Sequence, residues 1–285
     1  MVWDDKRKQA LKIRFTIGPL LLLAIGLIYY IDVKWGGQGR LSAGLLAILG
    51  LVGLWEFVAM WKEVKRPIAA APLMLIGLLT FIAGFRPTEL GEAWLPFLHL
   101  WIGAFVLLLG SMLWGLSPKR HARAVEAAAT ALLAYLWIVS PMYLGQKLAL
   151  WALPVLLFIV LVSKGGDIGA YLVGSAIGKH KLIPHVSPGK TVEGFVGSLL
   201  TSCLLAWLLG GLVGNPSLNV WALLLLGVTI NLATQLGDLS ESLLKRSCGV
   251  KDSSTLLPEH GGILDLVDSL LFAIPVYILT YILLT

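Results

Sequence analysis

Long uncharged apolar runs recur along the whole chain, and they limit the folds that it can adopt. A run of about 18 or more apolar residues is long enough to cross a bilayer as a helix. Only 13% of the 285 residues are charged, and 58% are hydrophobic, whereas about 25% of residues are charged in a typical soluble domain. Backbone polar groups in lipid must be satisfied internally, and the runs show little strict alternation of apolar and polar residues. The sequence therefore predicts an all-α polytopic membrane bundle and not a β-barrel.

Nine helical spans can be drawn, and they divide the basic residues unevenly between the two sides of the membrane. The spans lie near 15–31, 41–61, 68–85, 97–116, 124–145, 148–163, 191–213, 218–236 and 263–284. One side holds 18 of the 22 Lys and Arg residues: Lys6, Arg7, Lys8, Lys12, Arg14, Lys62, Lys65, Arg66, Lys119, Arg120, Arg123, Lys164, Lys179, Lys181, Lys190, Lys245, Arg246 and Lys251. The other side holds Lys34, Arg40, Arg86 and Lys147. Because cytoplasmic loops are enriched in Lys and Arg, we expect the basic side and the N-terminus to face the cytoplasm, in the plasma (inner) membrane.

The polar residues are also uneven along the chain. We expect residues 1–146 to form a scaffold of mostly plain apolar helices, and residues 147–285 to form a catalytic region with cytoplasmic loops at 164–190 and 237–262. Two acids interrupt the first part, Glu56 and Glu126. A carboxylate within a membrane span suggests a functional site by default. Glu126 suits the start of a helix and favours a structural role, whereas Glu56 is compatible with either.

Acidic residues in the second part are spaced as metal ligands on helices could be. Asp238 and Glu241 are three residues apart, as are Asp265 and Asp268, so each pair would share one face of a helix. Like charges this close are unfavourable unless a cation lies between them. Ligation by oxygen alone favours Mg²⁺ or Mn²⁺ over zinc. The sequence therefore predicts a divalent cation held by these four side chains, and the alternative is two solvated helix starts.

Basic and glycine residues near these acids suggest that phosphate is bound. Lys245, Arg246 and Lys251 supply cations, and Gly261 and Gly262 precede a helix start, where backbone N–H groups can approach an anion. The segment "SPGKT" is no P-loop, because the first glycine of that motif is replaced by Pro184. His260 is the histidine best placed to donate a hydrogen bond to a phosphate or a leaving group.

The segment from Ser242 to Asp268, "SLLKRSCGVKDSSTLLPEHGGILDLVD", resembles the phosphatidate cytidylyltransferase (CDP-diacylglycerol synthase) family. The family pattern is S-x-x-K-R-x4-K-D-x-[GSA]-x2-[LIF]-[PG]-x-H-G-G-x-x-D-R-x-D. The chain departs from it at Leu266, which replaces Arg, and has Glu259 where Gly is common. The upstream segments "DIGAYLVGSAIGKHKL" and "SPGKTVEGFVGS" are also similar to this family. The resemblance covers roughly residues 160–285.

The resemblance implies that CTP and phosphatidate react to give CDP-diacylglycerol and pyrophosphate. It implies Asp238 and Asp265 as the principal cation ligands, with Asp268 and Glu241 in support. Whether a monovalent cation joins the divalent one stays open on the sequence. Phosphates would be bound by Lys190, Lys245, Arg246 and Lys251, and the remaining pocket residues would be Asp167, Ser187, Thr191, Glu193, Asp252, Gly261 and Gly262. The family also suggests a homodimer.

Other functions stay open on the sequence alone. The chain could act as another CTP-dependent lipid enzyme, such as a polyprenol kinase or a CDP-archaeol-type synthase. An ion transporter is a further alternative, although transporters usually place polar groups at the midplane of repeated halves. In this chain the acids cluster at predicted cytoplasmic helix ends, which favours a lipid enzyme. The basic residues are scattered among loops, so the net charge of +6 does not indicate nucleic-acid binding.

Overall fold

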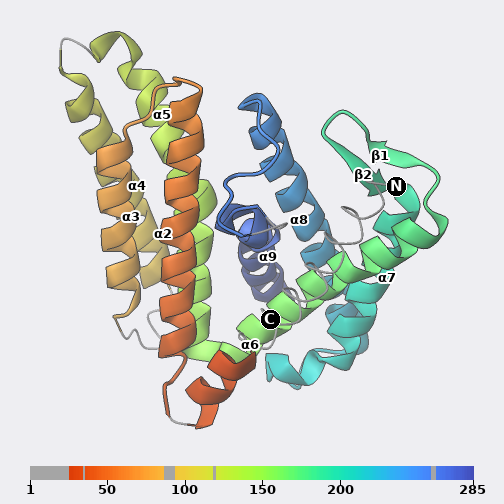
Figure 1. Ribbon diagram of the computed structural model, residues 1–285. Coiled ribbons are helices and arrows are strands. Elements are labelled where there is room, and N and C mark those ends of the chain that lie inside the picture. The colour runs from red at the N-terminus through yellow and green to blue at the C-terminus, as the bar shows by residue number, and fades with distance from the viewer. Residues whose placement is uncertain (1–25, 35, 87–93, 118–119, 258–260) are drawn as a thin grey trace.

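The computed structural model describes residues 26–34, 36–86, 94–117, 120–257 and 261–285 of the chain, and these are mostly helical (Figure 1). The elements are α2 (Arg40–Glu63), α3 (Ala70–Gly84), α4 (Leu95–Gly115), η2 (His121–Arg123), α5 (Ala124–Ala134), the π-helical η3 (Tyr135–Val139), α6 (Ser140–Ile177), β1 (Lys181–Ile183), β2 (Ser187–Thr191), α7 (Val192–Leu208), η4 (Gly210–Val213), α8 (Val220–Ser247) and α9 (Ile263–Leu284). Residues 26–34 are also helical. The short antiparallel hairpin of β1 and β2 is an addition to the all-α architecture that the sequence predicts.

Five helices of the described part are long and apolar enough to cross a membrane. They are Arg40–Glu63, Leu95–Gly115, His121–Ile177, Val220–Ser247 and Ile263–Leu284. Ala70–Gly84 and Val192–Leu208 are apolar but shorter. The chain is thus an α-helical, multi-pass membrane protein. The count of nine spans, the orientation and the division into two regions at residue 146 stay predictions.

The predicted cytoplasmic loops are shorter than the sequence suggests. α6 continues to Ile177 and α8 to Ser247, so residues 164–177 and 237–247 are helical and not loop. Polar residues prompted the loop assignment, but in the structure polar side chains of these segments have partners on neighbouring helices. A helix whose polar groups are paired need not end where its sequence becomes polar.

The spans predicted at 124–145 and 148–163 belong to helical segments that follow one another directly from α5 to α6. The helix continues through the predicted gap at 146–147, and a kink lies further along, at Ala152, which has φ −149° and ψ 65°. Pro154 explains the kink, because proline lacks a backbone N–H and its ring clashes with the preceding helical turn. Figure 1 shows that α6 changes direction here and crosses from the group of α2 to α5 into the group of α7 to α9.

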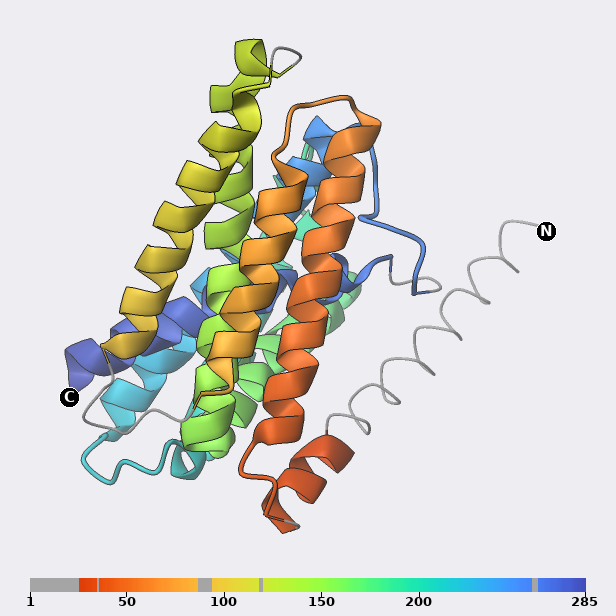
Figure 2. The same cartoon turned by 90° about the vertical axis from the view of Figure 1, so that its left-hand side faces the viewer.

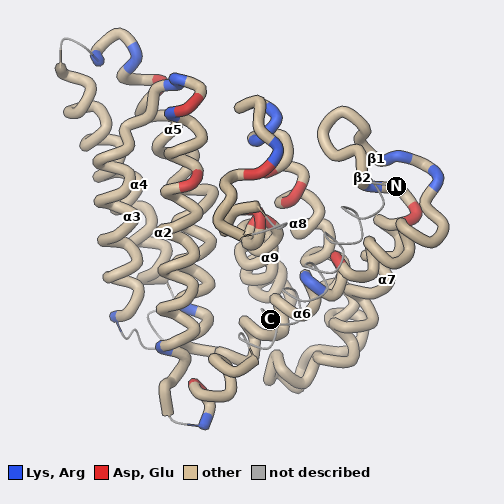
Figure 3. The backbone as a smooth tube through the Cα atoms, viewed as in Figure 1, with Lys and Arg blue, Asp and Glu red and all other residues tan. Residues whose placement is uncertain are grey.

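One end of the molecule gathers loops that are far apart in sequence. Arg66, after α2, donates to the carbonyl of Ser247 at the end of α8 (3.0 Å). Arg123, before α5, donates to the carbonyl of Lys65 (3.5 Å). Figure 3 shows Lys and Arg residues concentrated at this end of α2, α5 and α8 and around the hairpin. We call it the basic end.

The opposite end is formed by the other termini of the same helices. Lys147 of α6 donates to the carbonyl of Arg86, after α3 (2.9 Å), and Asn215, before α8, donates to Tyr281 near the end of α9 (3.1 Å). Successive helices therefore run in alternating directions between the two ends, and Figure 2 shows α2 to α5 upright and side by side. This arrangement places the end of α8 at the basic end, and α9 begins beside Glu56 of α2 and runs toward the opposite end.

Small residues allow the helices of the second group to approach closely. A Cβ atom at Gly237 of α8 would lie 2.6 Å from the carbonyl oxygen of Asp268 in α9. Asn231 of α8 donates to Ser198 (2.5 Å) and Ser202 (3.0 Å) of α7. Small residues and hydrogen bonds of this kind are typical of helix contacts in membranes. These contacts hold α8 against both α7 and α9. Helices α8 and α9 carry most of the candidate site.

Candidate functional site

A buried lysine joins α8 to α9 at the basic end. The ammonium nitrogen of Lys245 lies 2.5 Å from Oε2 of Glu241, one turn earlier in α8, and forms an ion pair with Oδ1 of Asp265 in α9. Glu241 is fully buried, and Lys245 is 9% exposed. Two carboxylates and one ammonium therefore share a site with little access to water. We call these three residues the Lys245 cluster.

The local sequence explains why Asp265 lies there. Asp265 occupies the first turn of α9, and its Oδ2 accepts hydrogen bonds from the backbone N–H of Gly262 and of Ser253 (both 2.8 Å). An acid three residues after the N-cap commonly accepts such a bond. The hydroxyl of Ser253 also donates to Asp265 (2.7 Å). Gly261 has φ +82°, a conformation that favours glycine, and this turns the chain into α9.

A second group of charges lies where α6, α8 and α9 meet. Lys164 of α6 donates to Ser269 (2.7 Å) and to the carbonyl of Leu266 (3.0 Å) in α9, and its nitrogen lies 3.7 Å from Asp167. Asp268 interacts electrostatically with Lys164, Asp238 and Asp167. Because Asp268 is only 7% exposed, these charges act on it with little solvent screening.

Asp238 connects this second group to the hairpin. Lys190 of β2 lies 2.8 Å from Asp238 and donates to Gln235, also in α8 (3.0 Å). We call Lys164, Asp167, Lys190, Asp238 and Asp268 the Lys164 cluster. Three acids and two lysines from four elements make it a polar site between helices that are otherwise apolar.

The structure brings one predicted ligand of α8 together with one of α9. Glu241 shares Lys245 with Asp265, whereas Asp238 pairs with Lys190 and its charge repels that of Asp268. Each pair three residues apart is thus divided between the two clusters. Within the part of the chain that the structure describes, no three His, Cys, Asp or Glu side chains are arranged so that they could hold a metal ion. The assignment of metal ligands stays a prediction.

The donor chemistry still suits a hard cation. Oε1 of Glu241 has no hydrogen-bond partner among the described residues, and Oε2 lies against the ammonium group of Lys245. Magnesium commonly uses one or two carboxylates and completes its octahedron with water and substrate phosphates. Glu241 with Asp265, or Asp238 with Asp268, could supply such a pair.

The remaining predicted residues fall into two segments. In the hairpin segment, Ser187 is half-buried. Thr191 caps α7 by accepting a hydrogen bond from the backbone N–H of Gly194 (3.1 Å), and Glu193 pairs with His180 (2.6 Å).

The second segment runs from the end of α8 to the start of α9. Arg246, Lys251 and Asp252 are exposed there and accessible to a ligand from the aqueous side, whereas Gly261 and Gly262 are buried. His260 lies outside the described residues.

Two residues of the site are not predicted from the sequence. The hydroxyl of Ser253 donates a hydrogen bond to Asp265. The ammonium group of Lys164 donates to the carbonyl of Leu266 in α9, whereas the sequence indicates Lys164 only as a basic loop residue. The sequence signal for Lys164 is the segment "SKGGD", which sets a lysine and an acid three residues apart after an apolar run. Nothing local marks Ser253, because its role depends on the fold.

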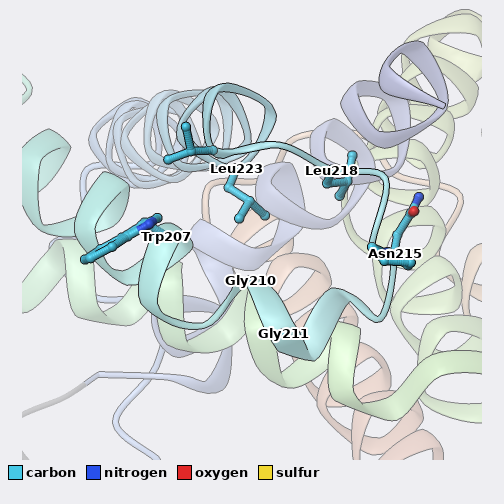
Figure 4. A pocket seen from close by; sticks show the side chains of 8 residues that line it. Trp207, Gly210, Gly211, Asn215, Leu218 and Leu223 are labelled. Carbon is cyan, nitrogen blue, oxygen red and sulfur yellow. The ribbon is translucent and has the colours of Figure 1, made fainter.

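The pocket in Figure 4 is a separate feature. Trp207, Gly210, Asn215, Leu218 and Leu223 are among the residues that line its volume of about 320 Å³. It lies where α7 ends and α8 begins, about 18 residues or roughly 27 Å along α8 from Asp238. It therefore takes no part in the charged clusters.

Comparison with known proteins shows the family of the chain. The model of the cytidylyltransferase family matches residues 13–284. The chain belongs to this family. It is 37% identical over 257 residues to a phosphatidate cytidylyltransferase from Staphylococcus epidermidis, covering 89% of this chain and 94% of the relative. The enzyme of the same name from Haemophilus influenzae is 45% identical over 127 residues, 43% of each chain. A Staphylococcus aureus relative is 50% identical over 109 residues, 38% of this chain and 42% of the relative.

Proposed function

We propose that this protein transfers the cytidylyl group of CTP to phosphatidate, which gives CDP-diacylglycerol and pyrophosphate for phospholipid biosynthesis. The match to phosphatidate cytidylyltransferases along most of the chain is the observation that carries the proposal. The two clusters support it, because they place lysines and carboxylates at the end of apolar helices. A lipid phosphate lies at that depth, just outside the hydrocarbon, and CTP approaches from water.

The transfer requires that the two substrates be held in position and that the negative charge of their phosphates be neutralised. An oxygen of the phosphatidate phosphate attacks the α-phosphorus of CTP, the bond from that phosphorus to the β-bridging oxygen breaks, and pyrophosphate leaves with the electron pair. No covalent enzyme intermediate is needed. In this proposal Lys190 and Lys245 stabilise the negative charge that gathers on the phosphate oxygens, with Arg246 and Lys251 at the aqueous edge.

A divalent cation would neutralise the phosphates and orient them for in-line attack. Asp238, Glu241, Asp265 and Asp268 are the side chains that would hold it, and Mg²⁺ or Mn²⁺ fits their oxygen atoms. The carboxylates would also keep Lys190 and Lys245 in place until substrate binds. A neighbouring monovalent cation would add to the same neutralisation.

We place the protein in the plasma (inner) membrane, with nine spans, the N-terminus in the cytoplasm and the site on the cytoplasmic face. The alternating helix directions and the gathering of Lys and Arg at the end that carries the site support this orientation. A homodimer, as the family suggests, is part of the proposal.

The test is an assay of purified protein in phosphatidate-containing vesicles with CTP labelled at the α-phosphate and Mg²⁺. We expect label in a lipid product and release of pyrophosphate. Archaeal-type ether phosphatidate in place of phosphatidate tests for a CDP-archaeol-type synthase. A polyprenol with CTP labelled at the γ-phosphate tests for a polyprenol kinase, which would transfer that phosphoryl group and release CDP. No labelled lipid from phosphatidate would refute the function, and equal rates after chelation of divalent cations would refute the metal assignment.

A further inference from the structure

Glu56 lies at the start of α9, although it belongs to α2 and is more than 200 residues away in sequence. Its side chain is fully buried. Oε1 accepts from the backbone N–H of Ile263 (2.9 Å) and Oε2 from that of Leu264 (2.7 Å). These two N–H groups are in the first turn of α9, where no helical carbonyl is available to them. Glu56 therefore caps α9 from another helix.

The same carboxylate also binds the loop before α9. The hydroxyl of Ser254 donates to Oε1 (2.7 Å), and the hydroxyl of Ser253 lies 3.2 Å from Oε2. Each carboxylate oxygen of Glu56 thus contacts one backbone N–H and one hydroxyl. The partial positive charge of a helix N-terminus stabilises an anion at this position.

Ser253 connects Glu56 to the Lys245 cluster. Its single hydroxyl lies between Oε2 of Glu56 and Oδ2 of Asp265, and the distance to Asp265 is 2.7 Å. Asp265 in turn pairs with Lys245. A continuous chain of contacts therefore runs from α2 through Ser253 and Asp265 to α8.

The glycine before α9 agrees with this close approach. A Cβ atom at Gly262 would lie 2.5 Å from both carboxylate oxygens of Glu56. The absence of a side chain at Gly262 lets the carboxylate of Glu56 reach the N–H groups of α9. A glycine of the family pattern thus has a partner in α2, at the glutamate whose role the sequence left open between structural and functional.

We infer that Glu56 is a positioning residue for the proposed cytidylyl transfer. It fixes the first turn of α9 and the preceding loop, and so holds Asp265 against Lys245. Glu56 does not contact the reacting groups; it acts through Ser253 and through the backbone of α9. The inference rests on the proposed function for its catalytic part, whereas its structural part can be measured without any substrate.

The central variant is Glu56→Gln, which keeps the size of the side chain but turns one acceptor oxygen into an NH₂ group that faces donors. Glu63→Gln is the matched control, because Glu63 is an exposed carboxylate on the same helix. Hydrogen exchange followed by mass spectrometry should show faster exchange at residues 263 and 264 in Glu56→Gln and not in the control. Unchanged exchange in the folded variant would overturn the inference, even if the wild type proved inactive with CTP and phosphatidate.

Kinetics test the catalytic part once wild-type activity is established. Glu56→Gln should lower kcat about 10- to 100-fold, the range for partners that orient metal-site residues, change KM for CTP much less, and raise the Mg²⁺ concentration needed for half-maximal rate. The double variant with Ser253→Ala should lose little more than Glu56→Gln alone, because both changes interrupt one chain of contacts. A wild-type kcat in Glu56→Gln would overturn the catalytic part of the inference, and so would losses of kcat in the double variant that equal the product of the two single losses.

If Glu56→Gln does not fold, the variant Ser254→Ala tests the same inference. It removes one hydrogen-bond donor to Glu56 and leaves the contacts of Asp265 intact. The inference requires that it lower kcat.

Discussion

Lys245 shows how the environment of a single side chain determines its role. Its ammonium group is buried between Glu241 and Asp265, and burying a charge is costly unless it is paired. The two carboxylates would repel each other without it. At the scale of one residue, Lys245 therefore stabilises the site by neutralising the two carboxylates, and in the proposed function the same ammonium group binds phosphate.

Removing this ammonium group should destabilise the protein as well as inactivate it. Lys245→Met leaves two buried carboxylates unpaired, and breaking a buried pair on one side typically costs about 3–5 kcal/mol. We expect a lower Tm and loss of cytidylyl transfer. Lys251→Met, at an exposed lysine, should keep the Tm. Adding Glu241→Gln to Lys245→Met should restore part of the Tm but no activity. A stable Lys245→Met protein would show that the carboxylates are not buried together.

Asp238 allows a second test at the residue scale. It pairs with Lys190 of the hairpin, and in the proposed function it binds a cation. Asp238→Asn keeps the shape and should lower turnover by at least about 100-fold, comparable with the loss of one preorganised electrostatic contact in an active site. The control Glu63→Gln changes an exposed carboxylate at the end of α2, outside the site, and should leave turnover near the wild-type value. Near wild-type turnover in Asp238→Asn would remove this residue from the site.

Helices α8 and α9 show which parts of the site follow from the sequence. Asp265 and Asp268 lie on α9 within the predicted span 263–284. Asp238 and Glu241 lie on α8, as their spacing suggested, although the predicted span ended at 236. Spacing could not show that the acids pair across the helices, because that depends on how α8 and α9 pack. Nor could it show Glu56 beside α9, since that contact joins residues more than 200 positions apart. Apolar runs predicted most helices well, but polar residues with partners on other helices were mistaken for loop.

The packing of α8 on α9 can be tested at Gly237. A Cβ atom there would press on the backbone carbonyl of Asp268, and backbone cannot move aside as a flexible side chain can. Gly237→Ala should therefore cost about 1–3 kcal/mol, as overpacking usually does, and separate Asp238 from Asp268. Gly211→Ala is the matched control, because a Cβ atom at Gly211 meets nothing within 4 Å. Equal Tm and activity in both variants would contradict the close approach.

The molecule as a whole is asymmetric between its two ends. The basic end holds the loop after α2 and the end of α8, and Glu241 and Lys245 lie in the last two turns of α8, whereas the opposite end holds the segment between α7 and α8. Lipid phosphates and CTP can meet only at a membrane surface, so the site must lie at one end. The excess of Lys and Arg predicts that this end faces the cytoplasm.

Cysteine labelling in whole cells tests this orientation. In a background with Cys203→Ser and Cys248→Ser, one added cysteine replaces Lys62, at the end of α2, or Ser217, between η4 and α8; both are exposed. A membrane-impermeant maleimide should react with Ser217→Cys in intact cells, and with Lys62→Cys only after the membrane is opened. The two positions lie at opposite ends of the helices, so they cannot share a side if the fold is correct. Labelling of both in intact cells would contradict the fold, and the reverse pattern would place the site outside the cytoplasm, away from CTP.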